Sequence, residues 1–139
     1  MAGALNFDFD DVFAFVRARV PGLMRAEGMA AIGWERDGAL VAGAVFEGYN
    51  GRNMWVHLAA REGGHWLTRG FIRAAMRYVF QVCGCARLSA WVNEGNTRSR
   101  RFTERFGFRQ EARLAGAAKD GGDVLIYVLT REACRHAIE

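Results

Sequence analysis

Segment 61–66 joins an expected strand to an expected long helix and contains two adjacent glycines. Adjacent glycines let the backbone turn sharply and expose its N–H groups, and the N-terminus of a helix favours a negatively charged ligand. The segment is therefore a candidate cradle for an anion such as phosphate. It consists of Arg61, Glu62, Gly63, Gly64, His65 and Trp66. The alternative is that the glycines only form a tight turn. The spacing matches neither a Walker loop nor a G-x-G-x-x-G dinucleotide motif.

A cluster of arginines provides a second set of possible anion ligands. Six arginines fall between Arg98 and Arg113, against only Glu104 and Glu111. The guanidinium group presents a fork of donors that suits phosphate, so the cluster favours an anion site. The alternative is an ordinary solvated helix face. The net charge of the whole chain is only +4, which argues against a nucleic-acid partner.

The three cysteines do not form a pattern that holds a metal ion. Cys83 and Cys85 are separated by one residue, and Cys134 has no nearby second cysteine to complete a zinc site. We therefore expect all three to be small, partly buried apolar residues, and we expect no metal.

Hydrophobic periodicity predicts the elements that must position these residues. Leu67, Phe71, Ala74, Tyr78 and Val82 share one face at helical spacing, which predicts an amphipathic helix over 65–82. Another helical pattern follows Asp10 and Asp11 and should end near Pro21. Short apolar or alternating segments predict strands at 30–34, 39–46, 53–59, 87–92, 108–114 and 123–129, a helix at 96–106 and a short helical tail at 131–136.

The order of these elements predicts a mixed α/β sheet of about six strands with helices on both faces. A chain of 139 residues is a usual size for one domain, so residues 1–139 should form a single domain. Strand 53–59, helix 65–82 and strand 87–92 should form a parallel crossover unit. The candidate anion cradle lies at the first turn of that unit.

The composition indicates in which compartment the protein is expected. Hydrophobic residues make up 51% and charged residues 24% of the chain, which is typical of a globular protein and not of a disordered one. No apolar stretch approaches the ~20 residues that a membrane-spanning helix requires. Asp8, Asp10 and Asp11 occupy the region where a signal peptide would be apolar. We therefore expect a cytoplasmic protein with no membrane partner.

Two segments together resemble the GNAT superfamily of acyl-CoA-dependent N-acyltransferases. The C-terminal signature of that family is N-x-x-[AS], a helix, and then [KR]-x-G-F. Here it is matched by Asn96, Ser99, Arg105, Gly107 and Phe108. The family's [QR]-x-x-G-x-[GA] consensus overlays Arg61, Gly64 and Trp66, with the bulky Trp66 in place of a small residue. The resemblance covers about residues 30–130. Small proteins of this type are also similar to GNAT-like proteins of phage and prophage genomes.

The resemblance implies an acetyl-CoA site between strands 53–59 and 87–92, which splay apart in this fold. The pyrophosphate would lie on the backbone amides of residues 62–66. Backbone N–H groups near Leu58 and Ala59 would hold the pantetheine arm and polarise the thioester carbonyl, and Asn96 would hydrogen-bond the pantetheine. The indole of Trp66 would either obstruct the pyrophosphate or stack on part of the cofactor.

The resemblance also implies direct attack of an amine on the thioester, which requires a base and an acid. His57 is the candidate base because imidazole titrates near neutral pH; the alternative is a structural histidine. Glu47 is a second candidate, expected to lie away from the sulfur. Ser99 resembles the serine that the protein-N-terminal, RimJ/RimL-like branch places near the sulfur; its alternative role is bonding the first helical turn. Thr103 stands where many members carry a tyrosine. Tyr127 is expected in the core.

The sequence therefore favours an acetyl-CoA-dependent N-acetyltransferase that acts on a small-molecule or protein amine. A catalytically silent fold that binds a partner is the alternative, and a nucleic-acid-binding module that uses the arginine cluster is the third reading. An exposed apolar patch at a sheet edge would indicate a homodimer. The residue pattern does not distinguish a protein N-terminus, a lysine, an amino sugar or a polyamine as the acceptor.

Overall fold

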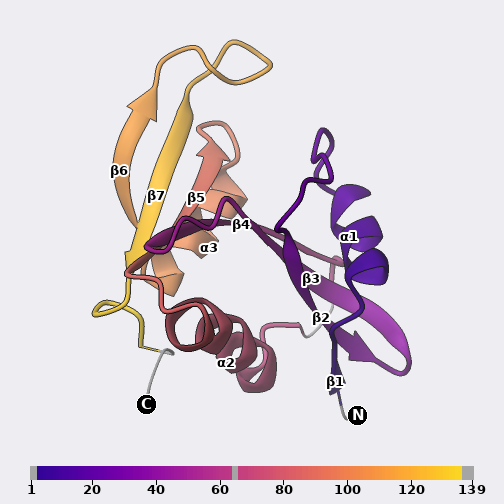
Figure 1. Ribbon diagram of the computed structural model, residues 1–139. Helices are drawn as coiled ribbons and strands as arrows, with labels where there is room; N and C mark the ends of the chain where they lie inside the picture. Colours follow the sequence, from indigo (N-terminus) through magenta and orange to yellow (C-terminus); the bar gives the residue numbers. More distant parts are fainter. Residues whose placement is uncertain (1–2, 64–65, 136–139) are drawn as a thin grey trace.

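The computed structural model describes residues 3–63 and 66–135 (Figure 1). Its elements in chain order are β1 (Gly3–Asn6), α1 (Phe9–Arg17), β2 (Ala30–Arg36), β3 (Ala39–Glu47), β4 (Asn53–Ala60), α2 (Arg69–Arg77), the π-helical turn η1 (Tyr78–Val82), β5 (Arg87–Asn93), α3 (Thr97–Phe106), β6 (Arg109–Leu114) and β7 (Val124–Thr130).

Within these residues, seven strands form one sheet in the order β1-β2-β3-β4-β5-β7-β6. Strands β4 and β5 are parallel, and the other neighbouring pairs are antiparallel. The β5-β7-β6 half lies on one side of the molecule, and β1–β3 lie on the other side with α1 (Figure 1). The predicted mixed sheet is confirmed.

The additional strand is β1, which the sequence pattern did not predict. It pairs antiparallel with β2 at the edge of the sheet. Gly3 lies directly against the indole of Trp34, where a Cβ atom would come within 2.3 Å of Cζ2. A strand of four residues has too little periodicity of its own to be recognised. This strand depends on its contact with β2, which is distant in the sequence.

Helices cover both faces of the sheet, as predicted. On one face, α1 packs Val12, Phe13 and Val16 against β2, β3 and β4. Close approach requires glycine in β3, since a Cβ atom at Gly43 would lie 2.9 Å from Val16 Cγ2. On the other face, α2 and η1 bury Phe71, Ala75, Met76, Val79 and Phe80 against the larger core cluster.

The N-terminal boundary of α1 differs from the prediction. Asp8 is the cap, and its carboxylate accepts the N–H of Asp11 at 3.0 Å. Asp10 and Asp11 therefore lie in the first helical turn, where their charges are favourable. The helix ends at Arg17, earlier than the expected end near Pro21.

The predicted helix over 65–82 begins later than expected, whereas its helical residues end at Val82 as predicted. Thr68 caps α2 by accepting the N–H of Phe71 at 3.3 Å, so the helix begins at Arg69. His65 lies outside the described residues. At the other end the chain continues as a π-helical turn, in which the N–H of Cys83 donates to the carbonyl of Tyr78.

The C-terminal segment forms turns rather than the predicted helix over residues 131–135; residue 136 lies outside the described part of the chain. The Oγ1 of Thr130 accepts the N–H of Ala133 at 3.2 Å, and buried Cys134 packs in the core. So short a segment cannot recover the free-energy cost of helix nucleation. Cys85 is also buried, Cys83 is half-buried, and all three thiols are free, as predicted.

Candidate active site

A gap opens in the sheet between the two parallel strands. β4 and β5 are paired only from Asn53 with Arg87 to Trp55 with Ser89. Beyond that point β4 stays paired with β3 as far as Ala60, and β5 stays paired with β7 as far as Asn93. Each strand thus follows its other neighbour, and the two strands diverge. The splay that the resemblance implied is present.

Polar side chains hold β4 and β5 together at the closed end of the gap. Asn53 Oδ1 accepts hydrogen bonds from Ser89 Oγ at 2.6 Å and from Arg87 Nε at 3.1 Å. Arg87 also forms an ion pair with Glu111 at 2.9 Å, and this guanidinium lowers the pKa of the Glu111 carboxyl. These bonds tie β4 to β5 where the strands are still paired.

A cavity of about 880 Å³ fills the gap and reaches both faces of the sheet. Its lining on the α2 and α3 face is mostly apolar and includes Val56, Phe71, Ala75, Met76, Leu88 and Phe106. Arg19, Pro21, His57, Trp91 and Asn93 also line it, and His57 and Trp91 project from the α1 face. A single cavity can therefore hold two reactants that approach from opposite faces.

Backbone donors of β4 face this cavity. The N–H of Arg61 donates to Val41 of β3 at 2.8 Å. Successive residues of a strand direct their N–H groups to opposite sides, so the N–H groups of Leu58 and Ala60 are directed away from β3, into the gap. The N–H of Ala59 is directed toward β3. Because β5 has diverged here, the donors at Leu58 and Ala60 have no strand partner.

The loop that follows β4 contains the predicted anion cradle. Arg61, Glu62 and Gly63 are exposed, and Gly63 has φ +72°, a backbone conformation that glycine adopts readily. Gly64 and His65 lie outside the described residues. Since α2 begins at Arg69 rather than directly after the glycines, its N-terminal dipole is displaced along the chain from the predicted position.

Trp66 bridges α2 and α3 on the face of the sheet that these helices cover. Its ring centroid lies 5.3 Å from that of Phe102 in α3 and 6.4 Å from that of Phe71 in α2. The indole is half-buried and forms part of the cavity wall. A small residue at this position would leave α2 and α3 without that contact.

Asn96 and Ser99 are brought together at the start of α3, and both line the cavity. Asn96 caps the helix because its Oδ1 accepts the N–H of Ser99 at 3.1 Å. The hydroxyl of Thr103 is buried and donates to the carbonyl of Ser99 at 2.7 Å. Thr103 is thus turned toward its own helix.

His57 and Glu47, considered separately in the sequence, form a direct side-chain hydrogen bond between Nε2 and the carboxylate. The side chain of His57 is 10% exposed and that of Glu47 is 32% exposed. Trp91 of β5 lies edge-on to the imidazole, with ring centroids 6.3 Å apart. The antiparallel register of β3 and β4 makes His57 and Glu47 diagonal neighbours. The sequence pattern does not give this register, and it therefore did not predict that the two side chains meet.

Tyr127 is fully buried, as predicted, and its hydroxyl donates to Glu104 at 2.7 Å. Burial, followed by this hydrogen bond, raises the pKa of the phenol. The bond joins β7 to α3, and it therefore helps to position the helix that carries Asn96 and Ser99.

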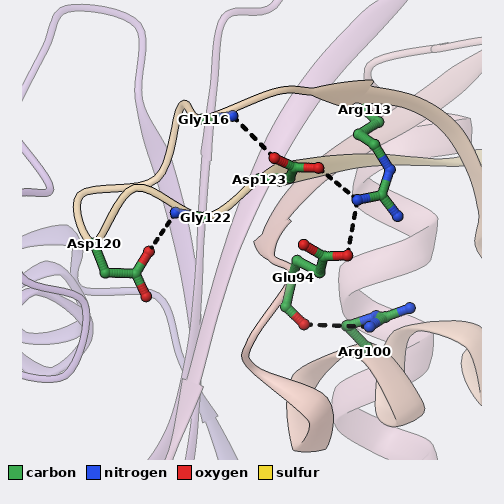
Figure 2. Close-up of polar contacts among 7 residues, drawn as sticks. All are labelled: Glu94, Arg100, Arg113, Gly116, Asp120, Gly122 and Asp123. Atoms are coloured by element: carbon green, nitrogen blue, oxygen red, sulfur yellow. Dashed lines mark hydrogen bonds and ion pairs between the residues drawn. The ribbon is translucent and has the colours of Figure 1, made fainter.

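A charged network fastens the β6–β7 connection beside the gap (Figure 2). Arg113 forms ion pairs with Asp123 at 2.6 Å and Glu94 at 2.8 Å. The carboxylate of Asp123 also accepts the N–H of Gly116 at 2.9 Å. This bond, followed by the guanidinium of Arg113, lowers the pKa of Asp123.

We expect the Asp123 contribution to stability to disappear in acid. A carboxyl whose pKa is lower in the folded state stabilises that state above its unfolded pKa, near 3.9, and loses the effect as the pH falls through the folded pKa. Nuclear magnetic resonance should show Asp123 titrating below its usual range. Arg113→Gln should raise this pKa only partly, since the Gly116 bond remains. Titration of wild-type Asp123 at the ordinary value would contradict the assignment.

No helix within residues 3–63 and 66–135 is long and apolar enough to cross a membrane. Over the same residues, no group of three or more His, Cys, Asp or Glu side chains is placed to hold a metal ion.

A mixed sheet that splays between two parallel strands is the architecture that the resemblance to the GNAT superfamily implied. The profile of the acetyltransferase (GNAT) family matches residues 6–108. The chain belongs to the acetyltransferase (GNAT) family. Among curated proteins, none matches this sequence.

Solved structures share the fold over nearly the whole chain. A chimera of spermidine N-acetyltransferase SpeG from Vibrio cholerae and hSSAT is 14% identical, with a TM-score of 0.76 over 95% of this chain and 98% of that one. A dodecameric structure of spermidine N-acetyltransferase from Vibrio cholerae is also 14% identical, with a TM-score of 0.75 over 94% of each chain. At this identity the similarity establishes the fold.

Proposed function

We propose that this protein transfers the acetyl group of acetyl-CoA directly to a primary amine in a ternary complex. The observation that carries the proposal is the cavity in the splayed gap, which is faced by the N–H groups of Leu58 and Ala60 and reaches both sides of the sheet. The family membership favours an enzyme over a catalytically silent binding protein.

The donor binds on the face of α2 and α3. The amides of residues 62–66 hold the pyrophosphate, with Arg98 of α3 close enough to Glu62, at 3.6 Å, to reach the same loop. Asn96 and the outward N–H groups of β4, from Leu58 through Ala60, bind the pantetheine arm. The thioester then lies within the gap, between β4 and β5.

The reaction then uses groups from both faces. His57 accepts a proton from the substrate ammonium, and the free amine attacks the thioester carbonyl. The N–H of Leu58 stabilises the negative charge that develops on the carbonyl oxygen. As the carbon–sulfur bond breaks, the nitrogen of the tetrahedral intermediate loses its second proton to the departing thiolate, which leaves as the CoA thiol. Ser99 donates a hydrogen bond to that sulfur, as in the RimJ/RimL-like branch that this residue resembles. Glu47 bonds the imidazole and holds its orientation.

The structural neighbours support an amine as acceptor, because those proteins are named as spermidine N-acetyltransferases. One of them is described as dodecameric, which supports self-association of this chain, with a homodimer as the simplest form. Light scattering of the purified protein tests that point separately from activity.

Calorimetric titration with acetyl-CoA tests the donor site. We expect saturable binding by the wild type and binding about threefold to tenfold weaker for Asn96→Ser, which loses the amide donor. A neutral hydrogen bond contributes about 0.5–1.5 kcal/mol. Serine is as good a helix cap as asparagine, so α3 should remain intact, whereas Asn96→Ala removes the cap as well.

Asn50→Ser is the matched control. Asn50 accepts the N–H groups of Arg52 and Asn53 in the turn before β4 and is not part of the cavity wall. Its replacement should leave the affinity unchanged. Absence of wild-type binding up to millimolar acetyl-CoA would reject the proposed function.

A further inference from the structure

The wall of the cavity on the acceptor side carries an arginine that the donor site does not use. If the proposed function is correct, acetyl-CoA occupies the face of α2 and α3, because the loop after β4 and the start of α3 lie there. The amine must then enter from the opposite face, beside α1 and His57. The residues Arg19, Val20 and Pro21, which follow α1, line the cavity.

Two contacts within this segment hold the guanidinium of Arg19. Its Nη1 donates to the carbonyl of Phe15 at 3.0 Å, and its Cζ lies 3.7 Å from the centroid of the Phe15 ring. Together they restrict the orientation of an otherwise exposed side chain. Only one of the guanidinium nitrogens makes the carbonyl bond, and the fork has five N–H donors in total.

The positive charge of Arg19 has no carboxylate partner among the described residues, whose ion pairs involve other arginines. Arg25, nearby in sequence, is instead paired with Asp10 at 2.7 Å. A guanidinium without a carboxylate, held in the wall of a cavity, is suited to bind an anionic group of a ligand.

The cavity wall carries other charged residues besides Arg19. Arg61, Glu62 and Arg98 line it at the donor loop, and Glu62 lies beside Arg98. On the acceptor side, the carboxylate of Glu47 is engaged by His57. A polyamine would bring several positive charges to this wall, and Arg19 would repel them.

We propose that Arg19 binds a carboxylate of the acceptor, so that the substrates are primary amines that carry a carboxylate near the amine, as free amino acids do. The ammonium lies toward His57 and the carboxylate toward the end of α1. A phosphonate in place of the carboxylate would satisfy the same guanidinium, and the experiment therefore includes both anions.

The test measures kcat/KM from the release of CoA for matched acceptors. Glycine and β-alanine are compared with their amides, which keep the amine but lack the anion, with aminomethylphosphonate and with spermidine. We expect Arg19→Gln to lower kcat/KM for the carboxylates about tenfold or more, because a charge-assisted hydrogen bond is lost, and to change the values for the amides less than about threefold. Arg19→Lys should retain part of the preference.

Arg17→Gln is the matched control, since Arg17 lies in the last turn of α1 but not in the cavity wall and its replacement removes the same charge. Equal effects of Arg17→Gln and Arg19→Gln, or a wild-type preference for spermidine, would overturn the inference. Preference for the phosphonate over both carboxylates would overturn the choice of carboxylate. Calorimetry with acetyl-CoA distinguishes failure of the proposed function from failure of this inference. The first abolishes acetyl-CoA binding, whereas the second leaves it intact.

Discussion

Replacement of His57 by glutamine is expected to lower kcat for acetyl transfer about 10²–10⁴-fold at neutral pH, the range that a positioned general base contributes. Glutamine can still form a hydrogen bond with the Glu47 carboxylate that now holds the imidazole. It cannot accept the proton of the attacking ammonium. Because His57 lies on the face opposite the donor helices, acetyl-CoA affinity should change less than about threefold.

The pH dependence distinguishes a base from a structural residue. An amine that has already lost its proton needs no base, so the defect of His57→Gln should shrink as the pH rises above the pKa of the acceptor amine. A structural defect would persist at every pH. The measurement is the initial rate of CoA release between about pH 6 and 11 with saturating donor, a window that passes the pKa of a primary amine, about 10.

Glu47→Gln provides the second arm of this experiment. If Glu47 acts through His57, the single change should reduce kcat, and the double variant should be no slower than His57→Gln alone, because groups that act as a unit are not additive. Additive losses would show that the carboxylate acts separately. A rate within twofold of the wild type for His57→Gln would exclude it as the base.

Much of the fold could be predicted because the apolar residues of each long element recur at the spacing of a helix or a strand. The alternation around Val56 and Met54, and the helical stretch that begins near Asn96, are local patterns that tertiary contacts preserve. Strand β1 is different, since it is held by pairing with β2. The start of α2 was missed as well, because the apolar spacing extends back to Leu67 whereas Thr68 caps the helix.

The candidate site was predictable where residues are close in sequence, as with Asn96 and Ser99 at one helix start. The pairing of His57 with Glu47 depends on the register between two strands, which hydrophobic alternation does not specify. Arg19 carried no signal at all. It joins the cavity because α1 ends beside the gap, and this position results from the packing of Val16 against Gly43.

The core next to the open gap must hold β4 and β5 together. β4 and β5 share few backbone bonds, so the closed end must be held by side chains. Leu88 lies there, opposite Met54 in the register, and it is both fully buried and part of the cavity floor. Stability and the shape of the site therefore depend on the same side chain.

We expect Leu88→Ala to reduce the free energy of unfolding by about 2–5 kcal/mol, the usual cost of such a truncation in a core. That is a large fraction of the roughly 5–15 kcal/mol that stabilises a domain. Urea unfolding measures the loss. Leu114→Ala is the matched control, since Leu114 on β6 is 46% exposed and its truncation should cost within about 0.5 kcal/mol.

The same variant links stability to the site. Removal of the Leu88 side chain enlarges the cavity floor, so a donor with a longer acyl group, such as butyryl-CoA, should lose less activity relative to acetyl-CoA in Leu88→Ala than in the wild type. Equal costs for Leu88→Ala and Leu114→Ala would show that the closed end of the gap is not the stabilising contact. An unchanged donor preference in a clearly destabilised variant would show that Leu88 supports the sheet without shaping the site, and the acyl group would then have to lie nearer the opening, against Trp91 and Asn93.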